Sequence, residues 1–277
     1  MLKKKTDTML RNPTKTFVRY IVTEPKRLRL EGKVAIVTAS TNGIGYSIAE
    51  CFAENGAKVL ISSRKKENVE KSVLALKEKG FDVRGMVCHV GKSADRKNLV
   101  EKALNDFGKI DIFVSNAAVN PVACPLLDTP EEAWDKIFDL NLKSSFLLAK
   151  EAVPHLSKTR GSMLFVSSVA GFMPMPLLGA YSISKTALLS LVKVLSAECA
   201  LKGVRINGLA PGVIKTDFSS FLTNSDQISA SFLEQTPMRR FGEPAECAGA
   251  AVFLSSDDAS YITGETIVIG GGYNCRL

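Results

Sequence analysis

Short apolar runs rich in β-branched residues alternate with longer stretches of helical character from Lys33 to the end of the chain. The runs lie at residues 34–38, 59–62, 83–87, 110–115, 162–167, 204–210 and 266–269. Because their apolarity is continuous rather than alternating, we expect strands that helices cover on both faces. Strands that alternate with helices indicate βαβ units. The pattern predicts an α/β fold with one doubly wound, seven-stranded parallel sheet and helices on both faces.

The stretches between these runs carry typical helix ends. Asn55-Gly56 and Lys79-Gly80 are typical of helix C-termini. Thr129 followed by Pro130 and two glutamates predicts a helix that Thr129 caps and Pro130 begins. Two long helices are expected at 130–157 and 181–202.

The chain contains no linker-like segment after residue 33, so we expect one domain over 31–277 after a basic extension over 1–30. Residues 215–242 break the alternating pattern and are rich in Ser, Thr and Phe. They follow a strand at the carboxyl edge of the sheet, where ligands bind in open α/β folds. This 215–242 segment is either a mobile lid over a ligand or an irregular surface excursion.

The net charge of +8 is concentrated at the N-terminus. Residues 1–33 hold ten of the 36 lysines and arginines but three of the 28 acidic residues, and so carry +7 of this charge. The nearly neutral remainder has no basic stripe, which excludes nucleic-acid binding as its main task. No apolar stretch approaches the ~18 residues of a spanning helix, so we predict no membrane span.

Both termini contain candidate targeting signals. The extension is basic like a mitochondrial presequence, but its acids and prolines also suit a solvated arm that packs partly on the domain. Cys275-Arg276-Leu277 matches the small-basic-leucine pattern that a peroxisomal import receptor binds. We expect the peroxisome or the cytoplasm, with the mitochondrion as the alternative. Six cysteines without a Cys-x-x-Cys pair favour a reducing compartment, and we predict no metal site.

Two loops after predicted strands favour a dinucleotide. In Thr38-Ala-Ser-Thr-Asn-Gly43-Ile-Gly45, glycines let the backbone approach a pyrophosphate and the next helix offers N–H donors. A simple tight turn is the alternative. Ser63-Arg64-Lys65 stands where dinucleotide folds meet the adenosine ribose. Because no acid occurs there and a guanidinium suits a 2′-phosphate, NADP(H) is favoured.

Tyr181 and Lys185 are four residues apart in a helical stretch and share one face. A Lys⁺ beside a phenol favours the phenolate and lowers its pKa, which makes tyrosine a working acid/base. Taken alone, this spacing is more often simple packing beside a solvated amine.

With its other motifs, the chain resembles the short-chain dehydrogenase/reductase family, which has a Rossmann-type fold, over residues 30–272. The motifs are the glycine turn, Asn116-Ala-Ala, Asn141, Ser168 thirteen residues before Tyr181, Tyr181-x-x-x-Lys185 and Pro211-Gly212. Within the family, the chain is similar to the NADP-dependent retinol dehydrogenase/reductase group, also called peroxisomal short-chain carbonyl reductases.

Three positions depart from the broader family pattern. Ala39 replaces the first glycine of the turn, so the turn must tolerate a methyl group. His89 stands where an Asp usually meets the adenine amino group, and a neutral His could accept or donate there. Ala118 replaces a signature glycine. The same variations recur in the carbonyl reductase group and so support the narrower resemblance.

The resemblance implies that NADPH delivers a hydride to a substrate carbonyl. Tyr181 would protonate the oxygen, and Ser168 would form a hydrogen bond with it. Lys185 would lower the Tyr181 pKa and bind the nicotinamide ribose, while Asn141 would hold a water that relays protons to Lys185. The implied cofactor-binding residues are Ser40, Asn42, Gly43, Ile44, Gly45, Ser63, Arg64, Lys65, His89, Val90, Asn116, Ala117, Ala118, Tyr181, Lys185, Pro211, Val213 and Thr216.

Apolar residues at 172–178, with Phe218, Phe221 and Phe232, suggest an apolar substrate pocket or, alternatively, subunit packing. The expected substrate contacts are Ser168, Phe172, Leu178 and Tyr181. We expect α-dicarbonyls, aromatic ketones and quinones as substrates, with retinal as a further candidate. The family usually forms homotetramers through the two long helices. The competing hypothesis is a non-catalytic NADP(H)-binding sensor or scaffold.

Overall fold

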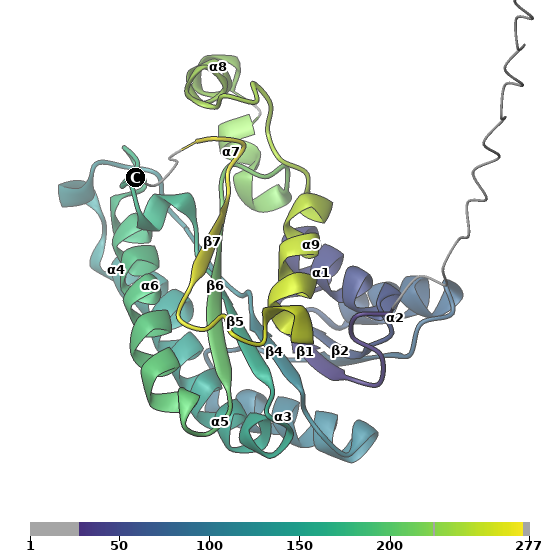
Figure 1. The fold of residues 1–277 in the computed structure, drawn as a ribbon. Coiled ribbons are helices and arrows are strands. Elements are labelled where there is room, and N and C mark those ends of the chain that lie inside the picture. Colours follow the sequence, from purple (N-terminus) through teal and green to yellow (C-terminus); the bar gives the residue numbers. More distant parts are fainter. Residues whose placement is uncertain (1–27, 224, 274–277) are drawn as a thin grey trace, which may run out of the picture.

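The computed structural model describes residues 28–223 and 225–273. Most of the predicted extension and the Cys275-Arg276-Leu277 end lie outside the described residues. One sheet of seven parallel strands has the order β3-β2-β1-β4-β5-β6-β7 (Figure 1). The strands are β1 (Val34–Val37), β2 (Lys58–Ser63), β3 (Val83–Val87), β4 (Ile112–Ser115), β5 (Ser162–Val166), β6 (Arg205–Pro211) and β7 (Thr266–Ile269).

Helices cover both faces of this sheet (Figure 1). The longer ones are α1 (Gly43–Glu54), α2 (Lys66–Glu78), α3 (Ser93–Phe107), α4 (Glu131–Phe138), α5 (Ser144–Thr159), α6 (Gly179–Ala200), α8 (Asp226–Gln235) and α9 (Pro244–Ser255). The predicted Rossmann-type, doubly wound parallel sheet is therefore confirmed.

Alternate residues of each strand pack into two separate cores. In β1, Ala35 and Val37 join the core under α1, α2 and α9, which includes Phe52. Ile36 joins the other core, where Leu148 of α5 packs with side chains of α3 and α6. Both faces of the sheet are buried, which is why the strand sequences are apolar throughout.

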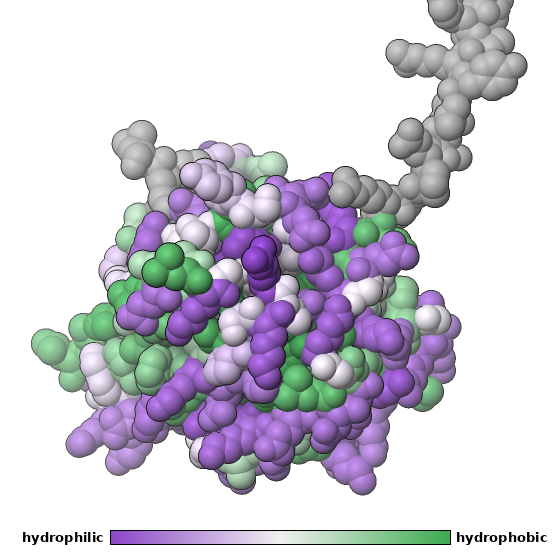
Figure 2. Space-filling view, turned by 60° about the horizontal axis from the view of Figure 1, so that its bottom comes forward, coloured by the Kyte–Doolittle hydropathy of each residue, from purple (hydrophilic) through white to green (hydrophobic). Residues whose placement is uncertain are grey.

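The strand order reverses its direction between β1 and β4. In open α/β sheets this reversal leaves a crevice at the carboxyl ends of the strands, where ligands bind. The 215–242 segment lies above that edge, with the short helix α7 (Ser220–Thr223) and α8 at the top of Figure 1. Its ends are paired, because the Lys215 N–H donates to the Gly242 carbonyl at 2.9 Å. Figure 2 brings the opposite edge forward, and hydrophilic residues cover most of it.

The helix expected over 130–157 is in fact interrupted. It begins at Glu131, with Pro130 as the N-cap residue, and a π-helical turn over Asp139–Lys143 separates α4 from α5. The Asn141 side chain in this turn forms hydrogen bonds outside its own helix. The Ser144 and Ser145 hydroxyls donate to the Leu140 and Asn141 carbonyls at 2.7 and 2.9 Å. These tertiary and local bonds stabilise the wider turn, and no periodicity in the sequence indicates it.

The lengths and apolarity of the helices bear on membrane crossing. Within residues 28–223 and 225–273, none is long and apolar enough to span a bilayer.

Leu76→Ala is expected to lower the free energy of unfolding by about 2–5 kcal/mol, because it leaves a cavity at a fully buried position of α2. Leu74→Ala on the same helix is the matched control, since Leu74 is 60% exposed. The control should change stability by less than about 0.5 kcal/mol. Urea titration measures both values, and equal destabilisation would contradict the described packing of α2.

Candidate active site

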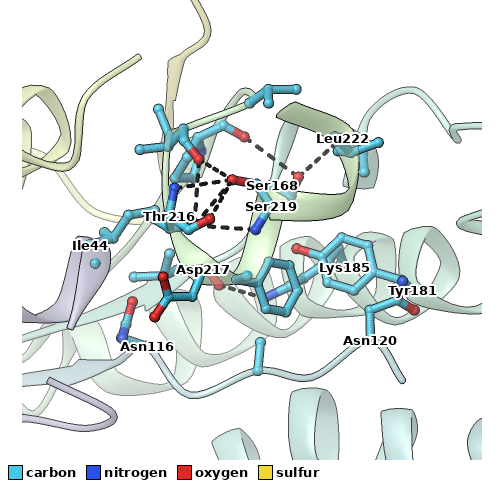
Figure 3. Close-up of a pocket in the computed structure, with 18 of the residues that line it drawn as sticks. Ile44, Asn116, Asn120, Ser168, Tyr181, Lys185, Thr216, Asp217, Ser219 and Leu222 are labelled. Carbon is cyan, nitrogen blue, oxygen red and sulfur yellow. Dashed lines mark hydrogen bonds between the residues drawn. The ribbon is translucent and has the colours of Figure 1, made fainter. Parts of the chain in front are cut away.

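A cavity of about 400 Å³ lies at the carboxyl edge of the sheet. Its walls come from the ends of β1, β4, β5 and β6, from the start of α6 and from the 215–242 segment (Figure 3). A smaller cavity of about 160 Å³ adjoins it beyond the ends of β2 and β3. Asn42, Arg64 and Ala118 line both cavities.

The glycine turn forms one wall of the larger cavity. Asn42 caps α1 by accepting the Gly43 N–H at 2.7 Å, and Gly43 has a φ of +57°, a left-handed value that favours glycine. A Cβ on Gly45 would clash with the Asn116 amide and the Ala39 carbonyl. Ala39 adopts the left-handed backbone with a φ of +50°, so the turn does tolerate the methyl group there.

This wall fits a pyrophosphate. The N-terminus of α1 presents backbone N–H groups and a positive potential to the cavity, and the glycines keep side chains out of the approach. The cavity continues from this turn to Tyr181 and Lys185, as an extended dinucleotide requires.

The Arg64 side chain lies at the junction of the two cavities. It makes no hydrogen bond or ion pair with any residue in the described ranges. Ser63 lines the smaller cavity, whereas Lys65 lines neither. A free guanidinium at this position can bind a phosphate through two parallel hydrogen bonds.

His89 lines the smaller cavity in a defined tautomer. The Gly91 N–H donates to His89 Nδ1 at 3.1 Å, so that nitrogen carries no proton and the neutral ring has its proton on Nε2. Two further hydrogen bonds fix the loop after β3. The Asp95 carboxylate accepts the backbone N–H of His89 at 2.8 Å, and the Arg96 guanidinium donates to the Val90 carbonyl at 2.7 Å. Whether His89 donates to a ligand or accepts from it stays a prediction.

Ser168, Tyr181 and Lys185 meet in the larger cavity (Figure 3). Ser168 follows the end of β5, and its hydroxyl accepts the Ala170 N–H at 3.1 Å. Tyr181 and Lys185 lie one turn apart on α6, with the Lys185 amine 5.6 Å from the centre of the Tyr181 ring. Lys185 is 2% exposed, and its amine donates to the Val166 carbonyl at 2.8 Å.

Burial dominates the titration of this pair. It raises the pKa of Tyr181 to about 12, against an opposing interaction with the Ser168 hydroxyl, and it lowers the pKa of Lys185 to about 7. Burial therefore sets the direction of the Tyr181 pKa in the ligand-free fold, and a lowering by Lys185 stays a prediction. The physical reason is desolvation, which penalises both the phenolate and the ammonium ion.

Asn141 lies behind the cavity and lines neither it nor the smaller one. Its side chain accepts the Val119 N–H at 2.8 Å and donates to the Val119 carbonyl at 3.0 Å. The same amide also lies 3.1 Å from the Ser184 hydroxyl on α6. Asn141 therefore ties the loop after β4 to the helix that carries Tyr181 and Lys185.

The structure brings most of the expected site residues together. The larger cavity is lined by Asn42, Gly43, Ile44, Gly45, Arg64, Asn116, Ala118, Ser168, Leu178, Tyr181, Lys185, Pro211, Val213 and Thr216. Ser63, His89, Val90 and Ala117 line the smaller cavity, and Ser40, Lys65, Asn141 and Phe172 line neither. Ser40 is buried behind the turn, where its hydroxyl donates to the Val37 carbonyl at 2.6 Å.

Several lining residues had no sequence-based assignment. Asn120, Ile214, Asp217 and Leu222 line the larger cavity, and the Asp217 carboxylate accepts from the Asn42 amide at 2.5 Å. Phe218 and Phe221 line it as expected, with the Phe218 ring 5.8 Å from the Tyr181 ring. All of these residues follow β4 or β6 in the sequence. That position, at the edge of the sheet where ligands bind, is the feature that could have identified them as lining residues.

Residues 38–274 match the family model described as "Enoyl-(Acyl carrier protein) reductase". "Dehydrogenase/reductase SDR family member 4" of Oryctolagus cuniculus is 52% identical, over 91% of this chain and 97% of that protein. This chain belongs to the short-chain dehydrogenase/reductase family. As a short-chain dehydrogenase/reductase, it is a NAD(P)-dependent oxidoreductase.

Two solved structures show short-chain dehydrogenase/reductase relatives with different cofactors. A gluconate 5-dehydrogenase from Burkholderia cenocepacia J2315, in complex with NADP and tartrate, is 30% identical with a TM-score of 0.86, over 91% of this chain and 98% of that one. A 7 alpha-hydroxysteroid dehydrogenase, complexed with NADH and 7-oxo glycochenodeoxycholic acid, is 32% identical with a TM-score of 0.85 over the same shares.

Lys185→Met is expected to change the stability of the ligand-free fold in a pH-dependent way. The Lys185 pKa is about 7 in the fold and 10.5 ordinarily, so the unfolded chain binds more protons between these values and wild-type stability rises with pH across them. The cost of burying the amine is complete below about pH 7 and absent above 10.5.

The stability of Lys185→Met relative to wild type should therefore be constant below about pH 7 and should fall toward pH 10.5. Urea unfolding of both proteins at several pH values measures it. A variant that is destabilised equally at every pH would show that the amine is not desolvated in the fold.

Proposed function

We propose that this short-chain dehydrogenase/reductase is an NADPH-dependent carbonyl reductase. The observation that carries the proposal is the meeting of Ser168, Tyr181 and Lys185 in the cavity that the glycine turn begins. The proposed substrates are α-dicarbonyls, aromatic ketones and quinones, with retinal as a further candidate. Support for an apolar carbonyl comes from Met175, Leu178 and the two phenylalanines of the 215–242 segment, which line the cavity.

The proposed reaction divides its work between the residues of the cavity. When bound, reduced nicotinamide supplies a hydride for the carbonyl carbon. The Tyr181 hydroxyl donates its proton to the carbonyl oxygen, and Ser168 donates a hydrogen bond to the same oxygen as negative charge develops. With a pKa of about 12, the Tyr181 phenol is protonated at neutral pH, which is the state that can give a proton to the carbonyl oxygen.

Lys185 and Asn141 support the proton donor in this scheme. The buried Lys185 amine lies beside the Tyr181 ring, within the cavity, and would bind the ribose hydroxyls next to the nicotinamide. Asn141 would hold a water that relays protons to Lys185. Its hydrogen bond to Ser184, the residue before Lys185, supports a place next to this relay.

The preference for NADPH rests on the residues at the tip of β2. The Burkholderia relative was solved with NADP and the hydroxysteroid dehydrogenase with NADH, so the family alone does not decide the cofactor. Arg64 lies at the junction of the two cavities, and its guanidinium has no partner among residues 28–223 and 225–273. His89, Val90 and Ala117 would then surround the adenine in the smaller cavity.

We also propose a homotetramer built through α4, α5 and α6. Trp134, Phe146 and Val194 on these helices are 37%, 45% and 55% exposed, and large apolar side chains in such positions favour contact with another subunit. The peroxisome or the cytoplasm remains the proposed location. The name of the Oryctolagus relative does not indicate a cellular compartment. The C-terminal signal and most of the basic extension lie outside the described residues.

Tyr181→Phe should lower turnover by about 10²-fold or more, because it keeps the ring and removes the donated proton. NADPH binding, followed by nicotinamide fluorescence, should change little. Tyr261→Phe is the control, since Tyr261 is fully exposed and lines neither cavity. Unaltered turnover in Tyr181→Phe would reject the mechanism and favour a non-catalytic sensor or scaffold.

Arg64→Gln should lower kcat/KM with NADPH by about tenfold, because it removes a charge-assisted hydrogen bond near the surface. The kcat/KM with NADH should hardly change. Lys65→Gln removes a neighbouring charge that lines neither cavity, and we expect a smaller loss. Initial rates with both cofactors give the ratios. Equal losses with NADPH and NADH would contradict a contact between Arg64 and the 2′-phosphate.

A further inference from the structure

The larger cavity has an end for the cofactor and an end for the substrate. Ile44, Asn116 and Asp217 lie together on the side of the glycine turn in Figure 3, whereas Asn120 is drawn on the side of Tyr181. Apolar side chains make up much of the remaining lining of the cavity. They are Ala170, Met175, Leu178, Phe218, Phe221 and Leu222.

Asn120 is a polar side chain at this end that the proposed reaction does not use. Its amide forms no hydrogen bond with any residue in the described part of the chain. Two other polar side chains of the cavity have protein partners: Asp217 accepts from Asn42, and Asn116 donates to the Thr38 carbonyl at 3.0 Å. The Asn120 amide thus keeps both its donor and its acceptor for a ligand.

The backbone on either side of Asn120 restricts where this amide can lie. The Val119 N–H and carbonyl are both bonded to the Asn141 side chain, at 2.8 and 3.0 Å. Pro121 follows, and a residue before proline is confined to extended conformations. Asn120 is therefore presented from a fixed backbone, which lowers the entropic cost of binding a ligand through it.

We propose that Asn120 is a specificity-determining residue that forms a hydrogen bond with a second oxygen next to the reacting carbonyl of the substrate. This inference rests on the proposed carbonyl reductase activity and narrows its substrate class. Ser168 and Tyr181 hold the reacting oxygen, and the Asn120 amide donates to the neighbouring carbonyl of a vicinal diketone. It accepts instead from the hydroxyl of an α-hydroxyketone.

The preference for a substrate with a second oxygen follows from the hydrogen bonding of the Asn120 amide when a ligand is bound. A simple ketone that fills the cavity would exclude water from Asn120 and offer it no partner, which is unfavourable for a polar group. A site that hydrogen-bonds a substrate oxygen therefore discriminates against the analogue that lacks it. The hydrogen bond to the second oxygen also fixes the orientation of the substrate in the cavity.

Asn120→Leu tests the proposal, because leucine is close to asparagine in size and cannot form the hydrogen bond. The two substrates are phenylpropanedione and propiophenone, which differ by one carbonyl oxygen. The variant should lose about tenfold in kcat/KM for the diketone and little or nothing for the monoketone. Comparing variant with wild type on each substrate removes the higher intrinsic reactivity of the diketone.

Leu222→Ala is the matched control, since it alters the same end of the cavity without removing a polar group and should affect both substrates alike. NADPH affinity should be unchanged in Asn120→Leu. Equal losses on both substrates, or no loss on either, would overturn the role of Asn120 while leaving the proposed reductase intact. If the wild type reduces neither ketone with NADPH, the proposed function fails and this inference fails with it.

Discussion

The site depends on one buried amine between β5 and α6. Lys185 donates to the Val166 carbonyl at the end of β5, and the next residue, Ser167, donates its hydroxyl to the Lys185 carbonyl at 3.0 Å. These two bonds fix the start of α6 against the strand, so that Ser168 and Tyr181 face the same cavity. Desolvation makes the amine costly for the fold, as at many functional sites where stability is lower than the scaffold allows.

Around this junction, contacts between distant segments close the cavity. Asn42 caps α1 and also donates to Asp217, so one side chain joins the glycine turn to the 215–242 segment. Asn141 joins the loop after β4 to α6 through Val119 and Ser184. The reversal of strand order between β1 and β4 places all these segments at one edge. A parallel sheet thus supplies the rigid base, and side chains from the loops at its carboxyl edge and from α6 line the cavity.

Local patterns were sufficient to predict the sheet, the glycine turn and the shared face of Tyr181 and Lys185, because each depends on spacing within a few residues. Features that depend on tertiary contacts escaped prediction. The π-helical turn exists because Asn141 bonds to Val119, and the raised Tyr181 pKa exists because both residues of the pair are buried. Asn120 stands before a proline and is indistinguishable from an ordinary turn residue until the cavity is seen.

The most direct test of the central claim follows nicotinamide absorbance when the wild-type protein is mixed with a small α-dicarbonyl and either NADPH or NADH. The account predicts rapid loss of NADPH and slow loss of NADH, since the cavity combines the Tyr181 phenol with the Arg64 guanidinium that we propose for the 2′-phosphate. Equal rates would contradict the role of Arg64 in cofactor choice. No loss of either cofactor across a broad set of carbonyl compounds, despite tight NADPH binding, would contradict carbonyl reduction itself.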